Sequence, residues 1–200
     1  MYTSRRDAIN LFIVSALSLI AAVGFAALAF SSGKPRVIDL TEISIDKTTG
    51  LRMYEGQPFS GEARLYLVDG TLARAEQFKK GRRHGFLRMW FPEGTPSFDS
   101  SYEAGKRDGT TVSWWDNGNL RSRTHYVGDQ PDGVAWSWYR TGEKFKRYNY
   151  EAGQPVGIQR GWRRNGKLFS NFEYREGRAY GLRNSNLCVE LEDEMVAYSN

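Results

Sequence analysis

The clearest evidence for the fold lies in residues 109–142, which read GTTVSWWDNGNLRSRTHYVGDQPDGVAWSWYRTG. Gly109 and Gly133 are 24 residues apart, and each is followed nine residues later by another glycine, Gly118 or Gly142. The 24-residue spacing continues in both directions without an insertion or deletion, through Gly61, Gly85, Gly109, Gly133, Gly157 and Gly181. We call these six residues the period glycines. A fixed period of this length indicates a chain built from copies of one structural unit.

Each unit has the residues expected of a β-hairpin. Aromatic residues recur five positions after a period glycine, at Tyr66, Trp90, Trp114, Trp138 and Trp162, and seventeen positions after it, at Phe78, Tyr102, Tyr126, Tyr150, Tyr174 and Tyr198. Such residues favour strands. Dipeptides such as Asp69-Gly70 and Asn117-Gly118 end nine positions after a period glycine, and they predict two-residue type I′ turns because they tolerate positive φ. A second glycine connection joins successive hairpins, and Gly128, which lies five residues before its period glycine instead of four, predicts a slightly different loop there.

With a two-residue turn at this place, residues pair across the hairpin when their distances from the period glycine sum to 17. Each period glycine then faces the aromatic residue seventeen positions later, and we expect that ring to cover the exposed glycine backbone. The same arithmetic pairs Trp138 with Phe145, Trp162 with Phe169, Leu67 with Leu72, and Trp115 with Leu120.

Alternation along the strands then separates two faces of the sheet. We expect a candidate binding face that carries Tyr66, Trp90, Trp114, Trp138, Trp162, Arg64, Arg88, Arg121, Arg123 and Arg160, with Arg147 beside them. Indoles flanked by guanidinium groups can stack on sugar rings or hold anionic headgroups and peptides. The simpler interpretation is packing against the N-terminal strand or a neighbouring molecule. A register slip of one residue would exchange the two faces.

The N-terminus predicts an exported protein. Residues 11–30 read LFIVSALSLIAAVGFAALAF and contain no charge, and a helix of this length spans about 30 Å, the hydrocarbon thickness of a bilayer. Arg5 and Arg6 precede this segment, which favours a cytoplasmic N-terminus with the rest of the chain outside. We expect residues 1–30 to be either an uncleaved membrane anchor or a signal peptide that is cut near Ala29. A buried helix of a soluble protein is a third interpretation, but nothing downstream offers it a helical partner.

The remaining chain divides into a linker with a leading strand (residues 31–53, the strand within 37–45) and a repeat domain (residues 54–200) with six units, the last degenerate. At its end Leu187, Val189 and Leu191 alternate with polar residues. This alternation predicts a terminal strand that is protected from edge pairing by acidic residues.

Composition argues against most other classes of function. The net charge of +5 mildly favours anionic partners, but basic residues are interspersed with acidic ones along the repeats, so nucleic-acid binding is not expected. The two histidines, His84 and His125, lie in different units with no ligand-spaced neighbours. Asp108 and Asp132 precede period glycines, where they support turns more readily than acid–base chemistry. We therefore expect no catalytic residue, metal or cofactor, although a redox or metal role for the single cysteine, Cys188, stays open beside a structural one.

The repeat resembles a known family. Glycine connections, an aromatic pair after the glycine, Asn-Gly in mid-repeat and a tyrosine before the next connection are similar to MORN repeats. The form Trp-x-x-x-Gly, seen from Trp114 to Gly118 and from Trp138 to Gly142, resembles the bacterial MORN-variant family, some members of which are labelled antitoxin components. This resemblance covers roughly residues 54–181. It implies an elongated, all-β, antiparallel meander of stacked hairpins that contacts a protein or a lipid.

These observations predict a binding or scaffold protein and not an enzyme. We expect it to be displayed outside the cytoplasmic membrane, or secreted, and to contact a protein, lipid or envelope polymer, including an anionic lipid or glycan, through its repeat faces. The alternative is a cytoplasmic, antitoxin-like inhibitor, which the hydrophobic segment disfavours. An enzyme acting on glycans through Asp or Glu is a third hypothesis.

Overall fold

The computed structural model describes residues 36–182. These residues form an all-β structure dominated by one large, mostly antiparallel sheet, which confirms the all-β, antiparallel part of the predicted fold class. The predicted hydrophobic helix at residues 11–30, the terminal strand at residues 187–191 and Cys188 lie outside the described residues. Within residues 36–182, no helix has the length and the apolar character needed to cross a membrane.

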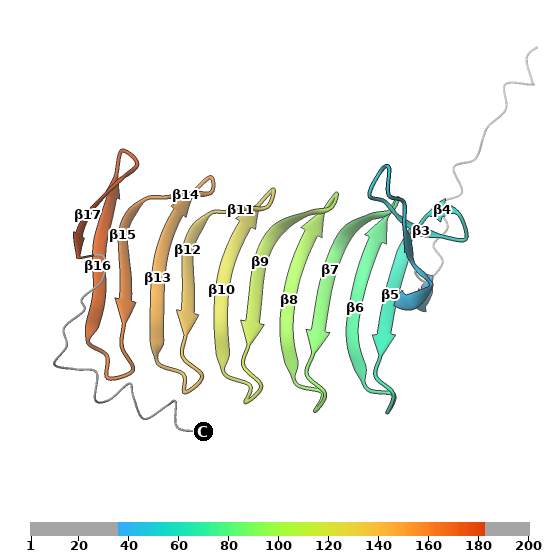
Figure 1. Cartoon of the computed structure of the whole chain (residues 1–200), viewed down its shortest axis with the longest axis horizontal. Helices are drawn as coiled ribbons and strands as arrows, with labels where there is room; N and C mark the ends of the chain where they lie inside the picture. Colours follow the sequence, from blue (N-terminus) through green and yellow to red (C-terminus); the bar gives the residue numbers. More distant parts are fainter. Residues whose placement is uncertain (1–35, 183–200) are drawn as a thin grey trace, which may run out of the picture. The chain divides into compact units, whose positions relative to one another are not determined.

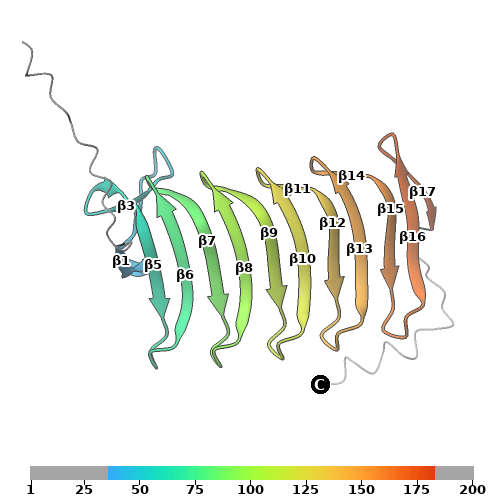
Figure 2. The same ribbon diagram turned by 180° about the vertical axis from the view of Figure 1, so that it is seen from behind.

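The large sheet follows the chain in sequence order (Figures 1 and 2). Its path runs through β1 (Val37–Asp39), β5 (Gly61–Tyr66), β6 (Leu72–Lys79), β7 (Arg82–Trp90), β8 (Pro96–Glu103), β9 (Lys106–Trp114), β10 (Leu120–Val127), β12 (Gly133–Trp138), β13 (Lys144–Glu151), β15 (Gly157–Trp162), β16 (Leu168–Arg175) and β17 (Arg178–Leu182). Two short strands lie off this path: β11 (Gln130–Pro131) pairs with β10, and β14 (Gln154–Pro155) pairs with β13. Only β1, at the N-terminal edge, is parallel to its neighbour. Each hairpin therefore packs beside the next one along the chain.

The N-terminal segment is more elaborate than the single leading strand predicted within residues 37–45. After β1 the chain forms a 3-10 turn, η1 (Leu40–Glu42), and then β2 (Ser44–Ile45). The strand breaks because the Asp39 side chain caps η1, accepting a hydrogen bond from the backbone N–H of Thr41. β2 joins β3 (Arg52–Tyr54) and β4 (Gln57–Pro58) in a separate three-stranded sheet, which lies across the boundary predicted between residues 53 and 54.

The type I′ turns lie in the row of connections opposite to the one predicted. Lys80 and Gly81 both have positive φ, at 50° and 75°, and connect Lys79 to its partner Arg82. This is the conformation that a two-residue I′ turn requires. The other turns of this row, which we call the I′ row, are Glu55-Gly56, Ala104-Gly105, Gly128-Asp129, Ala152-Gly153 and Glu176-Gly177. Gly128 and Asp129 occupy the same two positions in reversed order, with φ of 58° and 74°, so the loop predicted to differ keeps its length.

The Asp-Gly and Asn-Gly dipeptides form longer loops, so the predicted I′ turns are wrong at these sites. In the first loop, Leu67 donates its backbone N–H to Thr71 and accepts a hydrogen bond from Gly70. Only Gly70 of this loop has positive φ, at 87°. A three-residue loop that ends in a left-handed glycine is the G1-bulge form of the β-hairpin. We call this second row of connections the three-residue row.

The longer loop changes the register near each hairpin tip. Away from the tip the predicted pairing is confirmed: Gly61 faces Phe78, and Gly133 faces Tyr150. Near the tip a bulge shifts the register, so Trp138 pairs with Lys144 and not with Phe145. The predicted pairs of Trp162 with Phe169, Leu67 with Leu72, and Trp115 with Leu120 are wrong for the same reason, because Trp162 pairs with Leu168, Tyr66 with Leu72, and Trp114 with Leu120.

The expected covering of period glycines by aromatic rings is also wrong at several units. No atom lies within 4 Å of the place where a Cβ of Gly133 or Gly157 would stand. Both glycines have positive φ, at 80° and 60°, and this backbone conformation favours glycine at these positions. A ring does lie across a glycine at Gly161, where the Phe169 ring comes within 2.7 Å of the Cβ position.

Well-buried apolar side chains gather at the N-terminal end of the sheet. Phe59, Ala63 and Phe78 form a core against which Ile38, Leu40, Ile43 and Tyr54 pack. The Phe59 ring lies 5.9 Å from the Tyr54 ring and 5.9 Å from the Phe78 ring. The N-terminal segment therefore covers the first edge of the sheet and one face of its first hairpin, which closes an end that a repeat array must cap.

Candidate functional site

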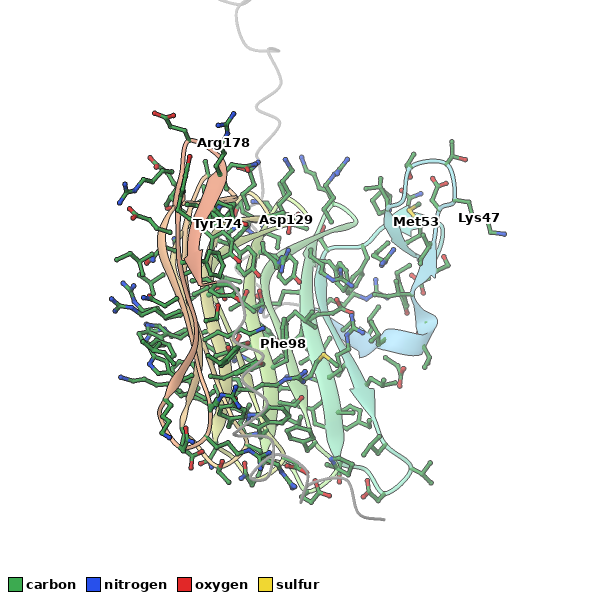
Figure 3. The ribbon with its side chains drawn as sticks, turned by 60° about the vertical axis from the view of Figure 1, so that its left-hand side comes forward. Lys47, Met53, Phe98, Asp129, Tyr174 and Arg178 are labelled. Atoms are coloured by element: carbon green, nitrogen blue, oxygen red, sulfur yellow. The ribbon has the colours of Figure 1, made fainter. Side chains whose placement is uncertain are left out.

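Side chains stand out from both faces of the sheet (Figure 3). One face, which we call the tyrosine face, carries the aromatic residues seventeen positions after each period glycine, and it holds most of the closely packed polar groups. Ser100 and Thr111 are buried there and share a hydrogen bond of 2.7 Å. Gln159 is also buried and bonds the backbone of Asn149. These buried polar groups therefore already have hydrogen-bond partners within the sheet.

The opposite face, which we call the indole face, contains most of the predicted binding residues. Trp90, Trp114, Trp138 and Trp162 occupy equivalent places at the ends of β7, β9, β12 and β15, and all four are partly exposed. Tyr66 has the same place on β5 and is 46% exposed. The strand register aligns these residues because each hairpin repeats the same 24-residue unit.

A single row of directly paired residues crosses the indole face. It passes through Arg64, Ala75, Arg88, Asp99, Val112, Arg123, Trp136, Arg147, Arg160 and Asn171, one residue on each successive strand from β5 to β16. We call it the central row. It contains four of the five predicted arginines, together with Arg147.

The fifth predicted arginine lies elsewhere. Arg121 is at the bulge near the hairpin tip, and its guanidinium lies 4.8 Å from the centre of the Trp115 ring. Trp115 follows Trp114 in the chain and its indole N–H donates to the backbone oxygen of Trp138. Arg121 therefore packs on Trp115 within its own hairpin and is separate from the central row.

At the N-terminal half of the central row, each arginine is neutralised by a carboxylate. Arg64 Nε lies 2.7 Å from Glu62, and the hydrogen bonds that the Arg64 guanidinium donates to the side chains of Tyr66 and Glu62 raise its pKa. Arg88 Nε lies 3.2 Å from Asp99, its direct partner on β8. These pairs leave little net charge on this half of the face.

At the C-terminal half, three arginines stand without such partners. Among residues 36–182, no carboxylate lies within ion-pair distance of Arg123, Arg147 or Arg160. Arg147 and Arg160 are directly opposite each other on β13 and β15, and like charges in this position destabilise a sheet. An arrangement that opposes stability is typical of a site that binds an opposite charge.

Three indoles stack beside these arginines. Trp136 lies 5.9 Å from Trp162 with their planes 16° apart, and 6.1 Å from Trp138 with their planes 23° apart. The Arg147 guanidinium and the Lys144 ammonium lie 5.8 Å and 5.5 Å from the centre of the Trp136 ring. The result is a partly exposed aromatic surface bordered by cations.

The sequence prediction missed Trp136 and Lys144. Trp136 stands two residues before Trp138 on one strand, so period-two alternation places both on the same face. That signal was available but was hidden because the other units have arginine, valine or another residue at this place. Lys144 could not be found, because its pairing with Trp138 depends on the bulge.

The residues considered for chemistry are scattered. His84 lies 3.2 Å from Glu103 in one hairpin, and His125 lies on another strand. Asp108 and Asp132 accept hydrogen bonds from the backbone N–H groups of Gly128 and Ala152. Each therefore supports the following turn of the I′ row, which agrees with the turn-supporting role that was predicted. Among the described residues, no three side chains of His, Cys, Asp or Glu are placed to hold a metal ion.

Comparison with known proteins gives no family for this chain. No model of a protein family matches it. A search among curated proteins finds no match either.

Proposed function

We propose that this protein is a non-enzymatic binding module that holds an anionic polymer of the cell envelope, such as an acidic glycan, on the C-terminal half of the indole face. The observation that carries the proposal is the alignment of Arg123, Arg147 and Arg160 in one row with no carboxylate partner among the described residues. Stacked indoles beside them offer flat surfaces for sugar rings, and the guanidinium groups suit carboxylate or phosphate groups.

The proposal includes membership of the MORN-repeat variants and export. The 24-residue period and the Trp-x-x-x-Gly form support the first part. The uncharged segment at residues 11–30 supports display outside the cytoplasmic membrane, through an anchor or after cleavage near Ala29. Cell fractionation tests this part, because a soluble cytoplasmic full-length protein would contradict export and favour the antitoxin-like inhibitor.

Binding can be tested with the full-length chain in a mild detergent and polygalacturonate as an acidic glycan, with neutral dextran for comparison. We expect saturable binding of polygalacturonate, read by tryptophan fluorescence and by titration calorimetry. Arg147→Gln combined with Arg160→Gln should weaken it by about a hundredfold or more, because each of the two lost charged hydrogen bonds contributes about 1.5–3 kcal/mol.

A matched control lies in the same row. Arg64→Gln combined with Arg88→Gln removes the same charge from arginines that already have carboxylate partners, so affinity should stay near that of the wild type. Equal losses in the two double variants would show that only net charge matters and would contradict the proposed site. Absence of polygalacturonate binding, with binding of anionic vesicles or acidic peptides instead, would replace the glycan with that ligand.

A further inference from the structure

A small pocket lies outside the indole face, where the N-terminal sheet meets the I′ row. Its volume is about 180 Å³, and Arg52, Arg82 and Arg83 line it together with Thr49, Gly81 and Gly105. This volume is below the range of about 300–1,000 Å³ that is usual for drug-sized ligands. The pocket can therefore hold a small chemical group and not a large molecule.

The backbone holds the pocket in shape. Arg52 donates its N–H to the Gly81 oxygen at 2.8 Å, and Gly81 donates its own N–H to Phe59 at 2.7 Å. A Cβ on Gly81 would lie only 2.9 Å from the Leu51 Cβ and 3.0 Å from the Arg52 oxygen. The close approach of the N-terminal sheet to this turn thus depends on glycine.

The charges in the pocket are not balanced. Arg83 is held by Glu76, whose carboxylate lies 2.7 Å from Arg83 Nε. Arg52 and Arg82 have no carboxylate within ion-pair distance among residues 36–182, and no carboxylate lines the pocket. The nearby Asp46 accepts hydrogen bonds from Thr48 and Thr49 of its own loop.

Arg82 is positioned by the next turn. Its Cβ lies 3.7 Å from the point where a Cβ of Gly105 would stand, so its stem rests on the glycine of the following I′ turn. The aliphatic part of the Arg82 side chain can pack there while its guanidinium group stays available for a ligand in the pocket. Arg52 and Arg82, which have no carboxylate partner among residues 36–182, thus line the pocket together with Arg83, and guanidinium groups are well suited to binding an oxyanion.

We propose that this pocket binds a phosphate monoester group, with Arg52 and Arg82 as its main ligands. The group is small enough for the cavity, and its double negative charge offsets the two unpaired guanidinium groups. Arg83, which is held by Glu76, lines the pocket beside the bound phosphate group. The phosphate can belong to a soluble molecule or to a phospholipid headgroup.

The test uses full-length protein in a mild detergent at constant ionic strength, with inorganic phosphate as the probe and chloride as the balancing anion. We expect saturable phosphate binding by calorimetry. Arg82→Gln should weaken it by about tenfold. Arg178→Gln is the matched control, because Arg178 is exposed and follows Glu176-Gly177 just as Arg82 follows Lys80-Gly81, but it does not line this pocket.

Two further probes distinguish the sources. Monomeric dihexanoyl phosphatidic acid and glycerol 3-phosphate carry the same group with and without acyl chains. Tighter binding of the lipid, lost in Arg82→Gln, would assign the pocket to a headgroup, whereas equal binding would assign it to soluble phosphates. The absence of saturable binding for all three probes, or equal losses in Arg82→Gln and Arg178→Gln, would overturn the proposal.

Discussion

The two halves of the sheet are built from the same 24-residue unit but differ in what their side chains contact. In the N-terminal half, β5 and β6 pack against the N-terminal segment, and the arginines of the central row have carboxylate partners. In the C-terminal half, β12 to β16 expose stacked indoles and place Arg147 opposite Arg160. The halves also differ in their backbone, because β7 and β9 each run unbroken through a period glycine, whereas the equivalent segments of the C-terminal half are divided into β11 and β12 and into β14 and β15. One half therefore holds the N-terminal core, and the other exposes the proposed binding surface.

The largest expected difference between the halves concerns equivalent glycines of the I′ row. Gly81→Ala should lower the free energy of unfolding by about 3 kcal/mol, because a positive φ is unfavourable for alanine and the backbone of Arg52 leaves no room. Gly177→Ala, where no atom lies within 4 Å of the Cβ position, should lower it by only about 1 kcal/mol. Thermal unfolding followed by circular dichroism measures both, and equal effects would contradict the tight packing of the N-terminal half.

Removal of the central indole should have the next largest effect. Trp136→Ala takes away a partly buried ring that stacks on Trp138 and Trp162, and we expect a loss of about 2 kcal/mol. Val112→Ala, at the equivalent place in the preceding unit, should lose about 1 kcal/mol. A smaller loss for Trp136→Ala than for Val112→Ala would show that the indole stack adds nothing to stability.

Reversal of one charge should act with opposite signs in the two halves. Arg147→Glu places a carboxylate opposite Arg160 and should stabilise the fold by about 0.5 kcal/mol. Arg88→Glu places a carboxylate opposite Asp99 and should destabilise it by about the same amount. Chemical unfolding at low salt should resolve the two shifts, and about 1 M salt should reduce both because it screens exposed charges. Shifts of the same sign would contradict the proposed charge distribution.

The smallest effect is expected at the turn between the halves. Hydrogen bonds from the backbone N–H and the side chain of Arg107 lower the pKa of the Asp129 carboxyl. A carboxyl with a lowered pKa stabilises the fold above its unfolded pKa of about 4. That contribution, no more than about 0.5 kcal/mol for a half-exposed group, is lost as pH falls further through the folded pKa. Asp129→Asn should therefore flatten the acid side of a plot of unfolding midpoint against pH, and an unchanged slope would contradict this role.

Much of the fold could be predicted from residue spacing. The 24-residue period set the hairpins, and the pairing of Gly61 with Phe78 followed from counting. The turn types could not be assigned in the same way, because Asp-Gly satisfies both a two-residue turn and the glycine position of a three-residue loop. Lys80-Gly81 and Ala104-Gly105 are less typical I′ sequences than Asn-Gly, yet their φ angles are positive at both residues.

The candidate site was predicted in outline only. Residue spacing placed Trp138 and Trp162 at equivalent positions of neighbouring hairpins. The bulge that brings Lys144 beside Trp138, however, depends on the conformation of the loop. The pairing of arginine with carboxylate in one half, and its absence in the other, depends on which residues of neighbouring hairpins become adjacent. Arg147 and Arg160 become direct partners only through the pairing register between two neighbouring hairpins, which their spacing in the chain does not specify.

Strand propensity and glycine spacing act locally, so residue order alone predicts the β-hairpin unit, its period and the order in which the hairpins follow one another. The type of turn at each connection, the carboxylate partners of the arginines, and the pocket lined by Arg52 and Arg82 could not be predicted in this way. These features depend on contacts between residues of different units, and such contacts exist only once the sheet has formed.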